Sequence, residues 1–144
     1  MKLIARGLLV LSIAALTLGA HAQQYYSYTG VTRVVKLRIL PGKSADFYKY
    51  LGHAVAILKA EQSAGVILGY DIAHTVNYEG VDKYDVAVVV HYKDMAAFDT
   101  LSSKTDPIVA QHYGSPEARA AAEKMATESA EVVSSELVRN IAMK

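Results

Sequence analysis

An imidazole and a carboxylate are the groups in this chain whose types and spacing could support acid–base chemistry. His91 and Asp71 lie in two alternating segments that a short loop containing Gly separates. Two such segments predict a β-hairpin. If Tyr78 pairs with Tyr84, Asp71 lies opposite His91, and directly opposed side chains have Cβ atoms about 4.5–5.5 Å apart. A carboxylate there could orient the imidazole, so we predict an acid–base or ligand-orienting pair.

Further polar residues are expected on the same face of the sheet. Lys36 and Arg38 alternate with apolar residues in the first predicted strand, and we name them, with Asp71 and His91, as candidate ligand-binding residues. The expected polar band comprises Lys36, Arg38, Asp71, Thr75, Asn77, Asp85, His91, Glu136 and Asn140. Two other interpretations stay open: antiparallel sheets often have one solvated face, and a dimer interface can hold the same ion pairs.

Several other chemistries are not indicated. The chain has no Cys, which excludes disulfides, thiolate metal ligands and Cys nucleophiles. His53, His74 and His112 lack the spacing of metal-binding motifs, and His74 should face away from His91. No phosphate-binding loop or nucleophile elbow occurs. We therefore expect no metal site and no cofactor, and whether the protein is an enzyme stays open.

Hydrophobic periodicity predicts the elements that would position these residues. Alternation predicts strands over 31–40, 66–78, 84–92 and 132–142. Helical spacing and capping residues predict helices over 44–62, 94–101 and 115–131. The segment 104–114, which contains Pro107, is expected to be a connection. The order is β-α-β-β-α-β with a divided second crossover, and both crossovers must pack back on one face of the sheet.

The sequence resembles the dimeric α+β barrel superfamily over residues 31–143. The resemblance rests on Pro41-Gly42-Lys43, which follows the first strand and opens an amphipathic helix, and on the short helix beginning at Asp94. Members include antibiotic-biosynthesis monooxygenases, NIPSNAP proteins and EthD-like proteins. The chain lacks the Trp that many of the monooxygenases carry near the pocket.

That resemblance implies the fold and the assembly. The fold is α+β, a ferredoxin-like β-α-β-β-α-β antiparallel sheet with helices on one face. Two such sheets face each other in a homodimer, the dimeric α+β barrel. In the superfamily, ligands bind between sheet and helices or inside the barrel.

The N-terminus shows the three-part pattern of a secretory signal peptide. Lys2 and Arg6 precede an uncharged apolar run that ends in Ala20-His21-Ala22, with small residues flanking a cleavage site. The run is shorter than the about 20 residues that a membrane-spanning helix needs. We expect cleavage after Ala22, export to the periplasm or the medium, and no stable membrane anchor. The expected organisation is a signal peptide (1–22), a flexible leader (23–30) and one domain (31–143).

The charge balance narrows the range of partners. Loss of Lys2 and Arg6 lowers Lys+Arg from 15 to 13 against 14 Asp+Glu, so the mature chain has a net charge of −1. Without a basic run, nucleic-acid binding is not expected. The sequence favours an exported homodimer that binds a small organic ligand. A cofactor-independent monooxygenase- or isomerase-like enzyme, and a structural or interaction protein acting as a dimer, are the alternatives.

Overall fold

The computed structural model describes residues 25–77 and 79–144. The predicted signal peptide, the first two residues of the predicted leader and Tyr78 lie outside these residues. One compact unit comprises Gly30–Arg139, and the described part of the second comprises 25–29 and 140–144. Within 25–77 and 79–144, no helix combines the length and apolar character that crossing a membrane requires.

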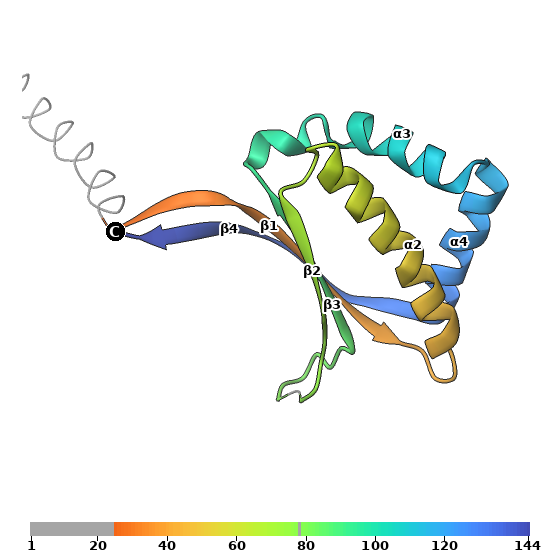
Figure 1. The fold of residues 1–144 in the computed structure, drawn as a ribbon. Helices are drawn as coiled ribbons and strands as arrows, with labels where there is room; N and C mark the ends of the chain where they lie inside the picture. The colour runs from red at the N-terminus through yellow and green to blue at the C-terminus, as the bar shows by residue number, and fades with distance from the viewer. Residues whose placement is uncertain (1–24, 78) are drawn as a thin grey trace, which may run out of the picture. The chain divides into compact units, whose positions relative to one another are not determined.

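Four strands form one antiparallel sheet in the order β2-β3-β1-β4 (Figure 1). The strands are β1 (Tyr26–Ile39), β2 (Gly69–His74), β3 (Val86–Tyr92) and β4 (Ala130–Met143). The central strands β1 and β3 pair antiparallel from Val31↔Tyr92 to Leu37↔Val86. This strand order, reached through two helical crossovers, confirms the predicted ferredoxin-like α+β fold.

The helices of the unit Gly30–Arg139 cover one face of its sheet (Figure 1). They are α2 (Ser44–Ser63), the short 3₁₀ helix η1 (Met95–Phe98), α3 (Leu101–Tyr113) and α4 (Pro116–Ser129). Asp94 caps η1 by accepting a hydrogen bond from Ala97 N at 3.1 Å. Ser115 caps α4 by accepting one from Ala118 N at 3.2 Å. Both caps lie where the sequence predicts helix starts.

The core lies between the helices and the sheet. Phe47 and Leu51 of α2 pack with Val86 of β3 in one cluster. Val90 and Tyr92, farther along β3, belong to a second cluster. Even-numbered residues of β3 thus face the helices. Since side chains alternate along a strand, the odd-numbered ones, including His91, lie on the open face.

The first strand starts earlier than predicted. Residues 26–30, expected to belong to a flexible leader, are part of β1. In the smaller unit, Lys144 N donates a hydrogen bond to Tyr25 O at 3.0 Å, and the rings of Tyr26 and Tyr28 meet edge to face at 5.6 Å. Tyrosine favours strands, so this Tyr-rich segment suits pairing although it lacks an apolar stripe.

The segment 104–114 is helical rather than a connection. It forms most of α3, with Pro107 inside the helix. Proline lacks an N–H donor and crowds the preceding turn, which is why the sequence favours a break there. Tertiary contacts offset this cost, because the rings of Tyr113 and of His53 from α2 pack 5.6 Å apart. Gly114, at φ 73°, ends the helix in the left-handed conformation that favours glycine.

Candidate functional site

A hydrogen-bonded chain of three side chains lies on the open face. The Thr32 hydroxyl and His91 Nδ1 are 3.0 Å apart, and His91 Nε2 is 3.0 Å from Asp71 Oδ2. A carboxylate only accepts hydrogen bonds, so His91 Nε2 carries a proton and donates it. In the neutral ring, Nδ1 then accepts from the Thr32 hydroxyl. The predicted proximity of Asp71 and His91 is present, and Thr32 extends it.

The strand register that creates this chain differs from the predicted one. Gly69 pairs with His91 and Asp71 with Val89, so Asp71 and His91 are diagonal rather than direct neighbours. The connection after β2 is longer than the expected loop, since β2 ends at His74. A shift of two residues keeps every side chain on its predicted face, whereas a shift of one would reverse all of them. Diagonal neighbours remain within reach of long side chains.

Both predicted cations on the open face have carboxylate partners in β4. Lys36 Nζ is 3.1 Å from Glu136 Oε1, and Arg38 Nη1 is 2.7 Å from Glu131 Oε1. Arg38 Nε also donates to Lys83 O at 2.8 Å. The hydrogen bond from Lys36, then that from Ser134, holds the pKa of Glu136 below its ordinary value. These contacts stabilise the sheet, and the roles of Lys36 and Arg38 in ligand binding stay predictions.

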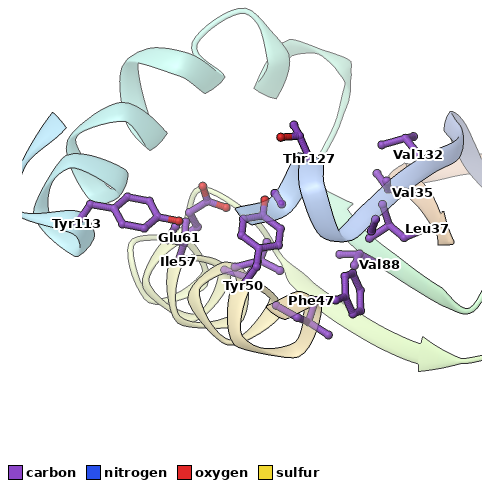
Figure 2. Close-up of a pocket in the computed structure, with 15 residues that line it drawn as sticks. Val35, Leu37, Phe47, Tyr50, Ile57, Glu61, Val88, Tyr113, Thr127 and Val132 are labelled. Atoms are coloured by element: carbon purple, nitrogen blue, oxygen red, sulfur yellow. The ribbon is translucent and has the colours of Figure 1, made fainter. Parts of the chain in front are cut away.

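The opposite side of the sheet contains a cavity in one of the two places where the resemblance implies ligand binding, but its lining residues were not predicted as a site. A space of about 440 Å³ lies between the sheet and the helices and is lined mainly by apolar side chains (Figure 2). Val35 and Leu37 of β1 and Val88 of β3 form its sheet wall, and α2 and α4 contribute Phe47 and Ala126. Ligand pockets in proteins are typically apolar clefts of about 300–1,000 Å³, so this cavity has the size and character of a binding site.

Glu61 is the one charged residue among those that line the cavity. It lies in the last turn of α2 and is only 8 % exposed. Burial raises the pKa of its carboxyl group above the ordinary value. Desolvation disfavours the charged form of an acid, and such acids occur frequently at functional sites.

Two tyrosines bring further polar groups to the same cavity. Tyr50 comes from α2 and Tyr113 from the end of α3. Burial, reinforced by the negative charge of Glu123, raises the pKa of Tyr50, and burial is also the main cause of the raised pKa of Tyr113. Figure 2 shows Tyr50, Tyr113 and Glu61 among the side chains that line the cavity. The cavity therefore has mainly apolar walls and a few polar groups.

A signal for Glu61 exists in the sequence. Phe47, Leu51, Ala54 and Leu58 form the apolar stripe of the predicted helix 44–62. Continuing the same alternating steps of four and three residues leads to Glu61, an acid on the buried face. Tyr113 gave no such signal, because its segment was expected to be a connection.

Two histidines outside the open face, His53 and His112, lie next to each other. His53 Nδ1 and His112 Nε2 are 3.0 Å apart, with ring centroids separated by 5.2 Å. These distances fit an N–H···N hydrogen bond in which the two nitrogens point at each other. Across residues 25–77 and 79–144, no group of three or more His, Cys, Asp or Glu side chains could hold a metal ion.

Comparisons with known proteins inform the fold. No protein-family model matches the sequence, and no curated protein does. The chain is similar in structure to protein SO0527 from Shewanella oneidensis, with a TM-score of 0.51 and 17 % identity over 81 % of this chain and 97 % of that one. It is also similar to a conserved protein of unknown function from Bacteroides thetaiotaomicron, described as a possible oxidoreductase, with a TM-score of 0.50 and 13 % identity over 79 % and 100 % of the two chains.

A third match is described in terms that the sequence analysis anticipated. It is a dimeric ferredoxin-like protein from an uncultured marine organism, with a TM-score of 0.46 and 11 % identity over 81 % of this chain and 90 % of that one. Identities this low show a shared architecture alone. The strand order β2-β3-β1-β4 is that of a ferredoxin-like α+β fold, and the matches to protein SO0527 and to the Bacteroides thetaiotaomicron protein are a likeness of fold.

Proposed function

We propose that this protein binds a small, mainly apolar organic molecule in the cavity between its sheet and its helices. The observation that carries this proposal is the cavity of about 440 Å³, whose walls are mainly apolar and include a few polar groups. The sheet wall is formed by residues of β1 and β3, the paired central strands. A rigid, largely preformed pocket costs little conformational entropy to occupy.

A fluorescent probe tests this proposal. N-phenyl-1-naphthylamine, a neutral apolar fluorophore, should bind saturably to the protein and gain fluorescence. Ala126→Phe fills the cavity from α4 and should weaken binding at least about tenfold, the equivalent of about 1.4 kcal/mol. Ala121→Phe makes the same change at an exposed position of α4 and should leave binding unchanged.

The outcome that contradicts the proposal is equally specific. Either no saturable binding, or equal weakening by both variants, would show that the cavity is not the binding site. Circular dichroism of both variants checks that they remain folded. Native mass spectrometry of protein from its own host then tests for a retained small molecule.

We also propose that the protein acts as a homodimer. β4 is an edge strand of the sheet, and its apolar residues Leu137 and Val138 are 44 % and 41 % exposed. Exposed apolar edges favour association with another chain. Light scattering during size exclusion should give twice the mass of one chain, and Leu137→Lys should shift the protein towards the monomer. A monomer at every concentration would contradict this proposal.

Export of the protein is a further proposal that its own sequence supports. Lys2 and Arg6, the apolar run and the small residues around His21 form a secretory signal. Intact-mass measurement of protein recovered from the periplasm or medium should give a chain that begins at Gln23. A full-length chain confined to the cytoplasm would contradict this proposal.

The chain Thr32–His91–Asp71 favours one alternative function, catalysis on the open face. A hydroxyl, an imidazole and a carboxylate joined in this order can pass a proton along the chain. His91→Ala should then abolish turnover of a substrate found by screening and leave ligand binding in the cavity unchanged. Activity that survives this substitution would assign the three residues to stabilising the sheet.

A further inference from the structure

The cavity follows one face of α2 over most of the length of the helix. Successive turns of this face each contribute a lining residue, namely Phe47, Leu51, Ala54, Leu58 and Glu61. At a rise of about 1.5 Å per residue, the distance along the helix axis from Phe47 to Glu61 is about 21 Å. Figure 2 shows these two side chains at separate points along the helix. The cavity is therefore long in one direction.

Contacts between α2 and the sheet limit the width of the cavity. Leu37 and Val88, which belong to its sheet wall, also pack against the buried cluster that contains Phe47 and Leu51. Farther along the helix, Leu58 packs against the second cluster of the core. Because α2 touches the sheet at both places, the free space runs beside these contacts and does not separate the two layers.

The volume and the length together give the width. Spread over about 21 Å, a volume of about 440 Å³ corresponds to a mean cross-section of about 20 Å². A circle of this area is about 5 Å across, which is close to the distance between neighbouring polypeptide strands. One extended hydrocarbon chain or a thin planar ring fits this width, whereas a skeleton of several puckered rings does not.

The walls of the cavity favour methylene groups over polar groups. Most of the lining side chains are hydrocarbon, and the hydroxyl of Thr127 already donates a hydrogen bond to Lys124 O at 3.0 Å. A sugar or a nucleotide needs a hydrogen-bond partner for each polar group that it buries, and these walls offer few. An aliphatic chain needs none and gains free energy from the burial of each methylene group.

We propose that the ligand has a single unbranched aliphatic chain, which lies along α2 between Phe47 and Glu61. An extended chain advances about 1.2 Å per bond, so a chain of about 12 to 18 carbon atoms matches the length of the cavity. This inference rests on the proposed function, the binding of an apolar molecule in the same cavity, and it names the class of that molecule.

A series of straight-chain alcohols tests the length of the cavity. 1-Hexanol, 1-octanol, 1-decanol, 1-dodecanol and 1-tetradecanol are neutral and differ in chain length alone, and each is measured by displacement of N-phenyl-1-naphthylamine. Affinity should rise about two- to fourfold for each added methylene group, without levelling off before 1-tetradecanol. A gain that stops at eight carbon atoms or fewer would overturn the inference.

A compact alcohol with the same number of carbon atoms tests the width. Cyclododecanol holds its twelve carbon atoms in a ring that is wider than an extended chain. It should bind at least about tenfold more weakly than 1-dodecanol after both values are corrected for partition between water and octanol. Equal corrected affinities would show that the cavity does not select a single chain.

Two alanine positions of α2 assign the effect to this cavity. Ala54→Phe obstructs the middle of the α2 wall, so it should change binding of 1-hexanol less than about threefold but abolish the gain from 1-octanol to 1-tetradecanol. Ala56→Phe makes the same change at an exposed position outside the lining and should leave the whole series unchanged. Equal weakening of all five alcohols by Ala54→Phe would indicate a compact site and contradict the inference.

The results separate failure of this inference from failure of the proposed function. If N-phenyl-1-naphthylamine binds and Ala126→Phe weakens it, but the alcohols show no dependence on chain length, the cavity binds apolar molecules and the aliphatic chain is wrong. If N-phenyl-1-naphthylamine does not bind, the proposed function itself is wrong. Thermal unfolding checks that each variant is folded, and Ala54→Leu supplies a smaller obstruction at the same position if Ala54→Phe is not.

Discussion

Two glutamates on opposite sides of the same sheet have opposite surroundings. Glu61 lies on the helix side, buried in the lining of the cavity, and burial raises its pKa. Glu136 lies on the open face, exposed and bonded to Lys36 and Ser134, and these bonds lower its pKa. The difference shows how the two sides of the sheet treat an acid. The open face pairs Glu136 with a cation, whereas the helix side places Glu61 in the mainly apolar lining of the proposed binding cavity.

The largest effect that distinguishes the two sides should come from core packing. Val86 is 1 % exposed on the helix side of β3, and Val89 lies on the open face of the same strand. Val86→Ala should lower the free energy of unfolding by about 1.5–3 kcal/mol. Val89→Ala should cost about 1 kcal/mol or less. Urea denaturation measures both, and equal losses would contradict the assignment of the core to the helix side.

The next effect concerns the hydrogen-bonded chain on the open face. Thr32 is 5 % exposed, so loss of the imidazole removes a hydrogen bond from a buried hydroxyl. His91→Ala should lower the free energy of unfolding by about 0.5–1.5 kcal/mol. In a double-mutant cycle with Thr32→Val, the double variant should lose less stability than the sum of the losses in the two single variants. Strictly additive losses would show that the Thr32–His91 contact contributes nothing.

The two glutamates should give stability a pH dependence of opposite sign. The pKa of Glu61 is higher in the folded state than in the unfolded state. Its contribution to the free energy of unfolding is therefore fully present below the unfolded pKa and is lost as pH rises through the folded pKa. Relative to wild type, Glu61→Gln should therefore gain stability as pH rises, by no more than about 1.4 kcal/mol per pH unit, the limit for one proton.

Glu136 provides the matched comparison. Its folded pKa is lowered, so its contribution is present above the unfolded pKa and is lost as pH falls. Glu136→Gln should therefore become less stable than wild type toward neutral pH, and the difference should shrink in acid. Urea denaturation across the acidic to neutral range measures both variants. The same sign for both would contradict the account of the two faces.

The smallest effect should come from the ion pairs of the open face. Lys36 and Glu136 are 30 % and 49 % exposed in their side chains, so water and salt screen their attraction. Lys36→Met should change the midpoint of thermal unfolding only slightly, and the difference should vanish at high salt. A large, salt-independent loss would indicate that Lys36 has a role beyond this pair.

Sequence patterns predicted the faces of the strands better than the contacts between them. Alternation assigned His91 and Asp71 to one face, and that assignment survived a register shift of two residues. Asp71 and His91 were predicted to pair directly, and this register was wrong. Alternation of side chains does not specify how long the connecting loop is. Alternation along β1 did not single out Thr32, because its bond to His91 depends on the register between β1 and β3.

The resemblance implied ligand binding between sheet and helices or inside the barrel, but sequence reasoning missed the residues that line the cavity. Glu61 continues the apolar stripe of its helix, a signal that points to burial of an acid. The cavity also needs Tyr113, which lies in a helix that Pro107 argued against. A void forms where side chains from several elements fail to fill the space between them, and that depends on packing in three dimensions. Periodicity along one segment carries no information about it.

The account's central claim is that ligands bind on the helix side of the sheet. Methyl-resolved NMR of the protein titrated with N-phenyl-1-naphthylamine tests it most directly, because Val88 and Val89 are neighbours in β3 that face opposite sides. The account predicts that the methyl signals of Val88 and Leu37 shift with saturation and those of Val89 and Val34 do not. Shifts at Val89 and Val34 with unchanged signals at Val88 and Leu37 would contradict it.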